Sequence, residues 1–230
     1  MNEVKPLSKC YMCDAPGITK EHAPPDSFFP TGHRDGLWTV PSCDLHNSAN
    51  SKDVEYVRNV ITSHINANDA GMVHFQNKAI RSFEHSPKLF ERTFASAKPI
   101  ILNGEETAVY TFDLPRYKNV MEAIAYAVYF RMFGKTFRGS WLTFSPSIVS
   151  ETSLLEGKPD GWDEYRRMLL KIPYNQVPTP QPKIFKLGIY QWNQDQFIYA
   201  FVFYEGFVVN PLSQPASVAA AQQIVGRERR

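Results

Sequence analysis

The chain has 230 residues and a formal net charge of +2, and 43% of its residues are hydrophobic, enough to bury a sizeable core. Because 13% are aromatic and 21% are charged, the composition excludes an intrinsically disordered chain. The small net charge gives little of the attraction expected of a strong non-specific DNA binder. No apolar run approaches the length of about 18 residues that spans a bilayer, so we expect a cytoplasmic protein without a membrane partner.

Residues 10–50 form the first distinct segment, which is rich in Cys, His, Pro, Gly and Asn and has no sustained hydrophobic period. Cys10 and Cys13 form one ligand pair, and Cys43 and His46 form another, each with two residues between its members. This spacing lets a tight turn present two side chains to one tetrahedral ion. We therefore predict a structural Zn²⁺ held by these four residues. Four protein ligands leave no open position, so this zinc would not be catalytic.

Two long helices are predicted beyond this segment. Apolar residues recur at spacings of three and four after Ser51, a suitable N-cap, and Gly71 is expected to end or bend this helix. Residues 113–133 keep the same period, with Pro115 suited to the first turn and Gly134 to the stop. Both helices are expected to bury one face.

Antiparallel hairpins and shorter helices are predicted for the rest of the chain. Residues 98–102 and 107–112 are β-rich and are joined through Asn103 and Gly104, a dipeptide favoured in tight hairpin turns. Residues 184–192 and 197–209 predict a second pair of strands. A short helix is predicted over residues 160–171, and residues 216–230 are either a last helix with a basic end or loose.

The order of motifs around the cysteines resembles the HNH (His-Asn-His) endonuclease family. The sequence Thr-Lys-Glu-His-Ala-Pro-Pro at 19–25 is followed by Val-Pro-Ser-Cys-Asp-Leu-His-Asn at 40–47 and then by a helix. The resemblance covers roughly the first quarter of the chain and implies a ββα-metal fold. It implies that His22 is the general base, and that Glu21 and Asn47 are ligands of a catalytic divalent metal, Mg²⁺ or a related ion.

The chemistry of such a site can be stated in general terms. Imidazole titrates near neutral pH and can take a proton from water, while a divalent cation polarises the phosphate and stabilises the leaving oxygen. Successive residues of a strand point to opposite sides, so Glu21 and His22 reach one phosphate only if the chain bends after them. Pro24 and Pro25 favour such a bend.

These observations predict an α+β protein in two parts. Residues 1–70 would form the zinc-stapled ββα-metal nuclease module, and residues 71–230 an α+β domain of helices and antiparallel hairpins. The predicted function is that of a metal-dependent endonuclease that hydrolyses phosphodiester bonds of nucleic acid, with DNA as the expected substrate. The second part carries no recognisable catalytic motif and would position the nucleic acid, a protein partner or a second copy of the chain.

The sequence leaves a second interpretation open, a non-catalytic zinc module that binds nucleic acid or protein. In the HNH family a central Asn on the second strand orients the base, whereas residues 36–40 here contain no Asn. A backbone carbonyl or Thr39 would have to orient His22 instead. In the second interpretation His22 is a structural or surface histidine. His33 is expected in a solvent-exposed loop between the two strands, where it could contact a phosphate together with Arg34.

Overall fold

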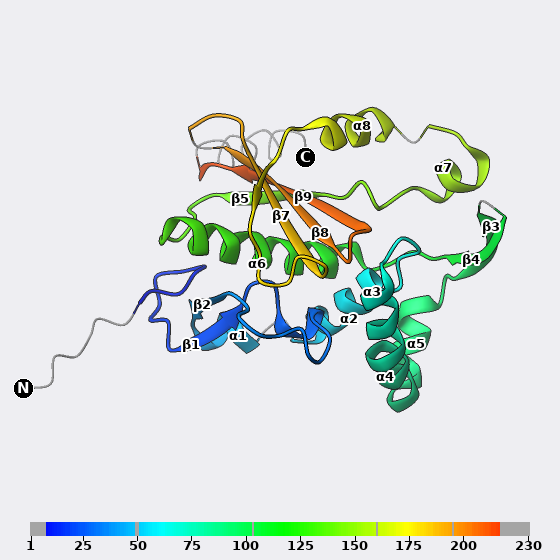
Figure 1. Cartoon of the computed structure of the whole chain (residues 1–230), viewed down its shortest axis with the longest axis horizontal. Coiled ribbons are helices and arrows are strands. Elements are labelled where there is room, and N and C mark those ends of the chain that lie inside the picture. Colours follow the sequence, from blue (N-terminus) through cyan, green and yellow to red (C-terminus); the bar gives the residue numbers. More distant parts are fainter. Residues whose placement is uncertain (1–7, 49–50, 103, 160, 195, 217–230) are drawn as a thin grey trace, which may run out of the picture.

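The computed structural model of the protein describes residues 8–48, 51–102, 104–159, 161–194 and 196–216, and it is an α+β structure. Its central element is the helix α6 (Leu114–Phe133), which packs against a five-stranded antiparallel sheet on one side and against the N-terminal segment on the other (Figure 1). The predicted mixture of helices and antiparallel strands is therefore confirmed.

The remaining elements are short. The strands are β1 (Thr19–His22), β2 (Thr39–Ser42), β3 (Lys98–Leu102), β4 (Glu105–Val109), β5 (Ser140–Phe144), β6 (Asn175–Val177), β7 (Phe185–Gln191), β8 (Phe197–Phe203) and β9 (Phe207–Gln214). The helices are η1 (Asp26–Phe28), α1 (Asp44–Ser48), α2 (Ser51–Thr62), α3 (Asp69–His74), η2 (Phe75–Ile80), α4 (Arg81–His85), α5 (Pro87–Phe94), α7 (Glu151–Glu156) and α8 (Asp163–Lys171). The large sheet has the order β5-β9-β8-β7-β6, and β1-β2 and β3-β4 are separate antiparallel pairs.

The predicted helix over residues 113–133 is confirmed, and its ends follow from local chemistry. The Asp113 side chain accepts a hydrogen bond from the backbone N–H of Arg116, which satisfies one of the free donors of the first turn. Gly134 takes the left-handed conformation that ends the helix, with φ of 65°. Met121 and Val128 are fully buried, so the helix contributes a large part of the core.

The helix predicted to begin at Ser51 was expected to end or bend at Gly71, and this expectation was wrong. That helix ends at Thr62, and a new helix, α3, starts at Asp69 with Asn68 as its N-cap. Gly71 lies inside α3, where an added Cβ would come within 3.0 Å of the Tyr204 ring. Its role is therefore close packing against a residue far away in the sequence, which a local pattern does not reveal.

The two hairpin predictions had different outcomes. The β3-β4 hairpin is confirmed, although β4 begins at Glu105 and Asn103 lies outside the described residues. The single strand predicted over residues 197–209 was wrong, because the chain turns at Tyr204 and Glu205 into β9. Both turn residues have positive φ, 49° and 61°, a conformation that sequence patterns associate with Asn and Gly.

The core is shared by both ends of the chain. Its largest cluster of buried side chains includes Phe28 and Tyr56 from the N-terminal segment and Phe201 and Val209 from the sheet. The predicted division after residue 70 falls inside α3, and whether residues 1–70 and 71–230 fold independently stays a prediction.

The other predictions concern the later helices. The helix predicted over residues 160–171 begins at Asp163, and the residues after Ala216 lie outside the described part of the chain. Among the helices of the described residues, none has both the length and the apolarity that crossing a bilayer requires.

Candidate metal centre and adjoining cavity

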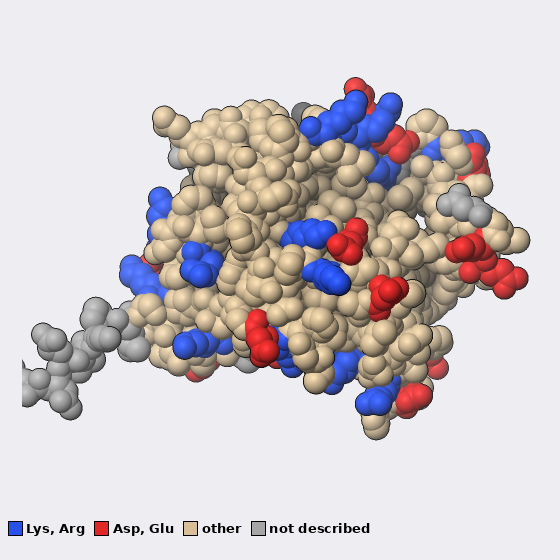
Figure 2. All heavy atoms as spheres, viewed as in Figure 1, with Lys and Arg blue, Asp and Glu red and all other residues tan. Residues whose placement is uncertain are grey.

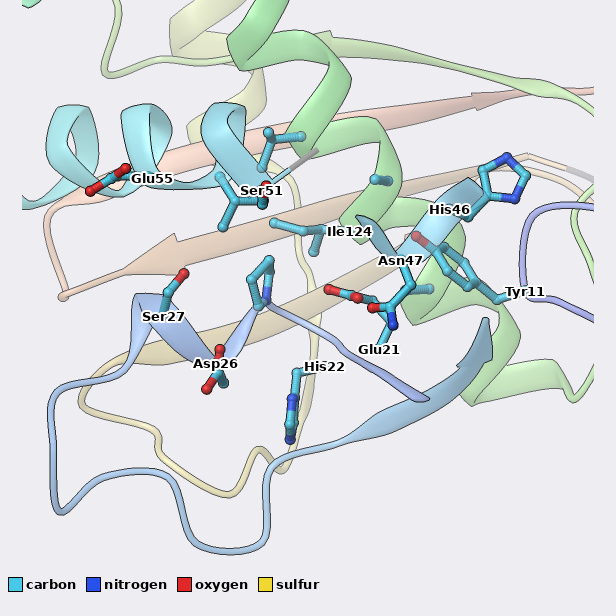
Figure 3. Close-up of a pocket in the computed structure, with 15 residues that line it drawn as sticks. Tyr11, Glu21, His22, Asp26, Ser27, His46, Asn47, Ser51, Glu55 and Ile124 are labelled. Atoms are coloured by element: carbon cyan, nitrogen blue, oxygen red, sulfur yellow. The ribbon is translucent and has the colours of Figure 1, made fainter. Parts of the chain in front are cut away.

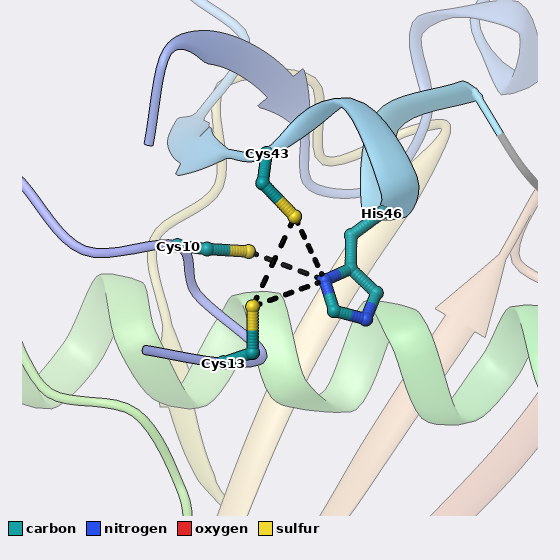
Figure 4. A group of neighbouring side chains, drawn as sticks. All are labelled: Cys10, Cys13, Cys43 and His46. Atoms are coloured by element: carbon teal, nitrogen blue, oxygen red, sulfur yellow. Dashed lines mark hydrogen bonds between the residues drawn. The ribbon is translucent and has the colours of Figure 1, made fainter. Parts of the chain in front are cut away.

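The four predicted zinc ligands converge on one point (Figure 4). The Nδ1 atom of His46 lies 3.4 Å from the Sγ of Cys10, 3.6 Å from that of Cys13 and 3.2 Å from that of Cys43. The Sγ atoms of Cys13 and Cys43 are 3.9 Å apart. A tetrahedral zinc with bonds of about 2.3 Å to sulfur and 2.0 Å to nitrogen needs ligand separations of roughly 3.5–3.8 Å. The side chains therefore fit a zinc ion, bound through Nδ1 of the imidazole.

Local backbone structure presents these ligands. Cys10 and Cys13 lie in a turn closed by a hydrogen bond from the backbone N–H of Cys10 to the carbonyl of Ala15. Burial opposes ionisation of the Cys10 thiol, but hydrogen bonds from the backbone of Met12 and Cys43 and from His46 outweigh it and lower its pKa to about 6. The thiolate, which is the form that binds metal, is therefore favoured at neutral pH.

The turn that carries Cys10 and Cys13 is also fixed to the loop after α6. The Thr136 hydroxyl donates to the carbonyl of Cys10 over 3.1 Å, and Arg138 forms a 2.6 Å ion pair with Asp14. A segment with little apolar patterning is thus ordered by ligands, hydrogen bonds and its contact with the rest of the protein.

A cavity of about 260 Å³ adjoins the ligand cluster, and all three predicted catalytic residues line it (Figure 3). Glu21 and His22 come from the end of β1, and Asn47 from α1. His46 and the buried Tyr11 also line the cavity, so it directly borders the metal-ligand cluster. In Figure 3 Glu21 and Asn47 lie toward each other, whereas the His22 ring is directed away from them.

The register of the β1-β2 hairpin explains these orientations. Glu21 lies opposite Val40, and His22 lies opposite Thr39. Residues opposite each other in an antiparallel pair share a face of the sheet. Val40 is 2% exposed, so Glu21 is on the inner face, while His22 shares the outer face with the exposed Thr39. No hydrogen bond to the His22 ring is found within the described residues, so the group that would orient it stays a prediction.

The cavity is acidic. Burial, and then repulsion from Asp26, raises the pKa of Glu21 to about 7. Asp26 and Glu55 line the same cavity. Each is paired with an arginine, Asp26 with Arg34 at 3.0 Å and Glu55 with Arg58 at 3.5 Å.

Two of these carboxylates were not singled out from the sequence as site residues. Asp26 follows the Pro-Pro pair and reaches the cavity because η1 starts directly there, and Glu55 lies one turn into α2. Within the part of the chain that the structure describes, Cys10, Cys13, Cys43 and His46 are the one convergent set of three or more His, Cys, Asp or Glu ligand atoms. The cavity carboxylates do not form such a set.

Comparison of the chain with known protein families, with curated proteins and with solved structures gives no match. The resemblance to the HNH family rests on the motif residues alone. Activity, nucleic-acid binding and a catalytic metal remain predictions.

Proposed function

We propose that the protein is a metal-dependent endonuclease of the HNH type that hydrolyses phosphodiester bonds of nucleic acid, with DNA as the first candidate substrate. The observation that carries this proposal is that Glu21, His22 and Asn47 line one cavity beside a cluster that fits zinc. The local order of the chain, a β-hairpin followed by a helix, is the order that the ββα-metal fold requires.

In this proposal each residue has a defined task. His22 takes the proton from the attacking water, since its ring borders the cavity from the outer face of the hairpin. Glu21 and Asn47 provide oxygen ligands for a divalent cation such as Mg²⁺. The cation, when bound, supplies Lewis-acid stabilisation of the phosphate. The zinc cluster fixes α1, and therefore Asn47, relative to the end of β1.

The test is a cleavage assay with Mg²⁺, Mn²⁺ or Ni²⁺ on plasmid DNA, single-stranded DNA and RNA. We expect His22→Ala to abolish cleavage without changing zinc content or thermal stability. The matched control is His85→Ala, which removes an exposed histidine at the end of α4. No cleavage by the wild type, or equal cleavage by His22→Ala, would contradict the proposal.

A second candidate function is a non-catalytic zinc module that binds nucleic acid or protein. It is favoured because Thr39 lies opposite His22 in the hairpin, whereas the HNH family has an Asn on the second strand that orients the base. Metal analysis separates the two candidates, because a binding module needs only zinc, whereas the nuclease binds a further divalent ion that is lost in Glu21→Ala. In either case we propose that the large sheet and its helices position the nucleic acid, a protein partner or a second copy of the chain.

A further inference from the structure

The cavity needs a cation if it is to receive a nucleic acid. Glu21, Asp26 and Glu55 are among the residues that line it, and none of its lining residues in the described part of the chain is a Lys or Arg, so the lining itself offers phosphate no cationic side chain. Figure 2 shows acidic and basic side chains interspersed over the face in view, with a group of Lys and Arg over α8. The face in view therefore provides no broad basic field, so the phosphates have to be attracted by individually placed cations, the proposed divalent metal and a side chain near the cavity.

Two arginines contact the cavity wall in different ways. Arg58 has a side chain only 9% exposed, and it is held by Asn59, Ser82 and Glu55. The Arg34 side chain is 39% exposed and pairs with Asp26, which lines the cavity. Arg34 is therefore the arginine that can meet a ligand from solvent.

The guanidinium of Arg34 is fixed in place before any ligand arrives. Its Nε donates to the carbonyl of Phe29 over 3.1 Å, and its Nη1 donates to Asp26 over 3.0 Å. These bonds use two of the five N–H donors of the group, so the others are available to phosphate oxygens. An arginine that is already ordered loses less conformational entropy when it binds.

The loop that carries Arg34, residues 30–36, is also braced from the C-terminal part of the chain. Gln181 Oε1 lies 3.3 Å from Nδ1 of His33, and its Nε2 donates to the carbonyl of Asp35 over 3.3 Å. The connector between β6 and β7 thus contacts the loop on both sides of Arg34 in the sequence, at His33 and Asp35. The C-terminal part of the chain therefore helps to hold Arg34 in place beside the cavity.

We propose that Arg34 is a positioning residue that binds a backbone phosphate of the nucleic acid at the edge of the cavity, an inference that rests on the nuclease function proposed above. The bound phosphate would neighbour the one that is hydrolysed, because Asp26 joins Arg34 to the wall shared with Glu21 and His22. Arg34 would set the register of the strand and take no part in proton transfer.

Simple removal of Arg34 would also unmask the charge of Asp26, so the test uses the double variant Arg34→Ala/Asp26→Asn, which keeps the net charge. The matched control is Lys158→Ala/Glu156→Gln, which removes an exposed ion pair at the end of α7 and also keeps the net charge. Both are made in the His22→Ala background, so the probes stay intact. Affinity for short labelled duplex DNA, single-stranded DNA and RNA is measured by fluorescence anisotropy at several salt concentrations.

We expect the Arg34 double variant to bind about tenfold more weakly, with the slope of log Kd against log salt reduced by about 1, and the control to bind as the parent does. Arg34→Lys, which keeps the charge but not the fork of donors, should lie between the two. Thermal unfolding and zinc content verify folding. If the double variant and Arg34→Lys bind as tightly as the parent, the inference is wrong while the nuclease proposal stands. If none of the three probes binds the His22→Ala parent, both the inference about Arg34 and the nuclease proposal fail.

Discussion

The phenol of Tyr204 donates a hydrogen bond to the backbone carbonyl of Phe28, which joins the turn between β8 and β9 to the end of η1. The same oxygen lies 2.6 Å from Nδ1 of His74. Because the single Tyr204 proton is given to Phe28, Nδ1 of His74 must be the donor. The Nε2 atom is then the unprotonated nitrogen, and it is buried without a partner among the described residues. A turn of the sheet therefore supports the wall that carries Asp26.

Tyr204→Phe should lower the free energy of unfolding by about 1–3 kcal/mol, because it leaves the Phe28 carbonyl and the His74 N–H buried without partners. Chemical denaturation measures this change. The control is Tyr199→Phe, since that hydroxyl is buried without a partner within the described residues and its removal should be neutral or stabilising. Equal losses of stability in the two variants would contradict the hydrogen bonds assigned to Tyr204 with Phe28 and His74.

Acidification should destabilise the protein through His74. Burial, and then the positive charges of Arg58 and Arg34, lower the pKa of His74 to about 4. The unfolded chain takes up a proton near pH 6.5 and the folded chain does not, so stability falls as the pH drops from about 6.5 towards 4, by up to about 3 kcal/mol. Denaturant midpoints of wild type and His74→Gln between pH 7 and 5 isolate this contribution. If the denaturant midpoints of wild type and His74→Gln change in parallel with pH, His74 does not cause the loss of stability.

Glu21→Gln should stabilise the zinc-bound protein above neutral pH when no divalent metal is bound at Glu21. The pKa of Glu21 is raised to about 7, first by burial, so its ionisation costs folding free energy that appears as the pH rises from about 4.5 to 7. The amide removes a cost of about 1–3 kcal/mol. We expect a higher Tm at pH 8 and no change at pH 4, together with loss of cleavage. A lower Tm at pH 8 would show that the carboxylate is satisfied in the fold.

Loss of zinc should unfold the segment around the ligand cluster. Cys43→Ala removes the ligand that lies between β2 and α1 and leaves the other three without a complete site, so we expect a loss of at least about 3 kcal/mol of stability. Elemental analysis and limited proteolysis of residues 8–48 measure the effect. His46→Cys is the control, since four thiolates also bind zinc, and it should keep the metal. Full zinc content in Cys43→Ala would refute the ligand set.

The local sequence determined the features that depend on neighbours along the chain. The ligand cluster followed from the spacing of Cys10 and Cys13 and of Cys43 and His46, because each pair is a short-range turn. The helix α6 followed from an unbroken apolar period between Asp113 and Gly134, where cap and stop residues act on adjacent backbone groups.

The tertiary structure alone decided the features that depend on distant partners. Gly71 lies inside a helix at a place where the Tyr204 ring leaves no room for a side chain, and the β8-β9 turn is held at Tyr204 by contacts to Phe28 and His74. The acidic wall around Glu21 arises in the same way, since Glu55 reaches it from another element. Such contacts join residues far apart in sequence, and no local pattern of residue types encodes the direction in which two distant elements meet.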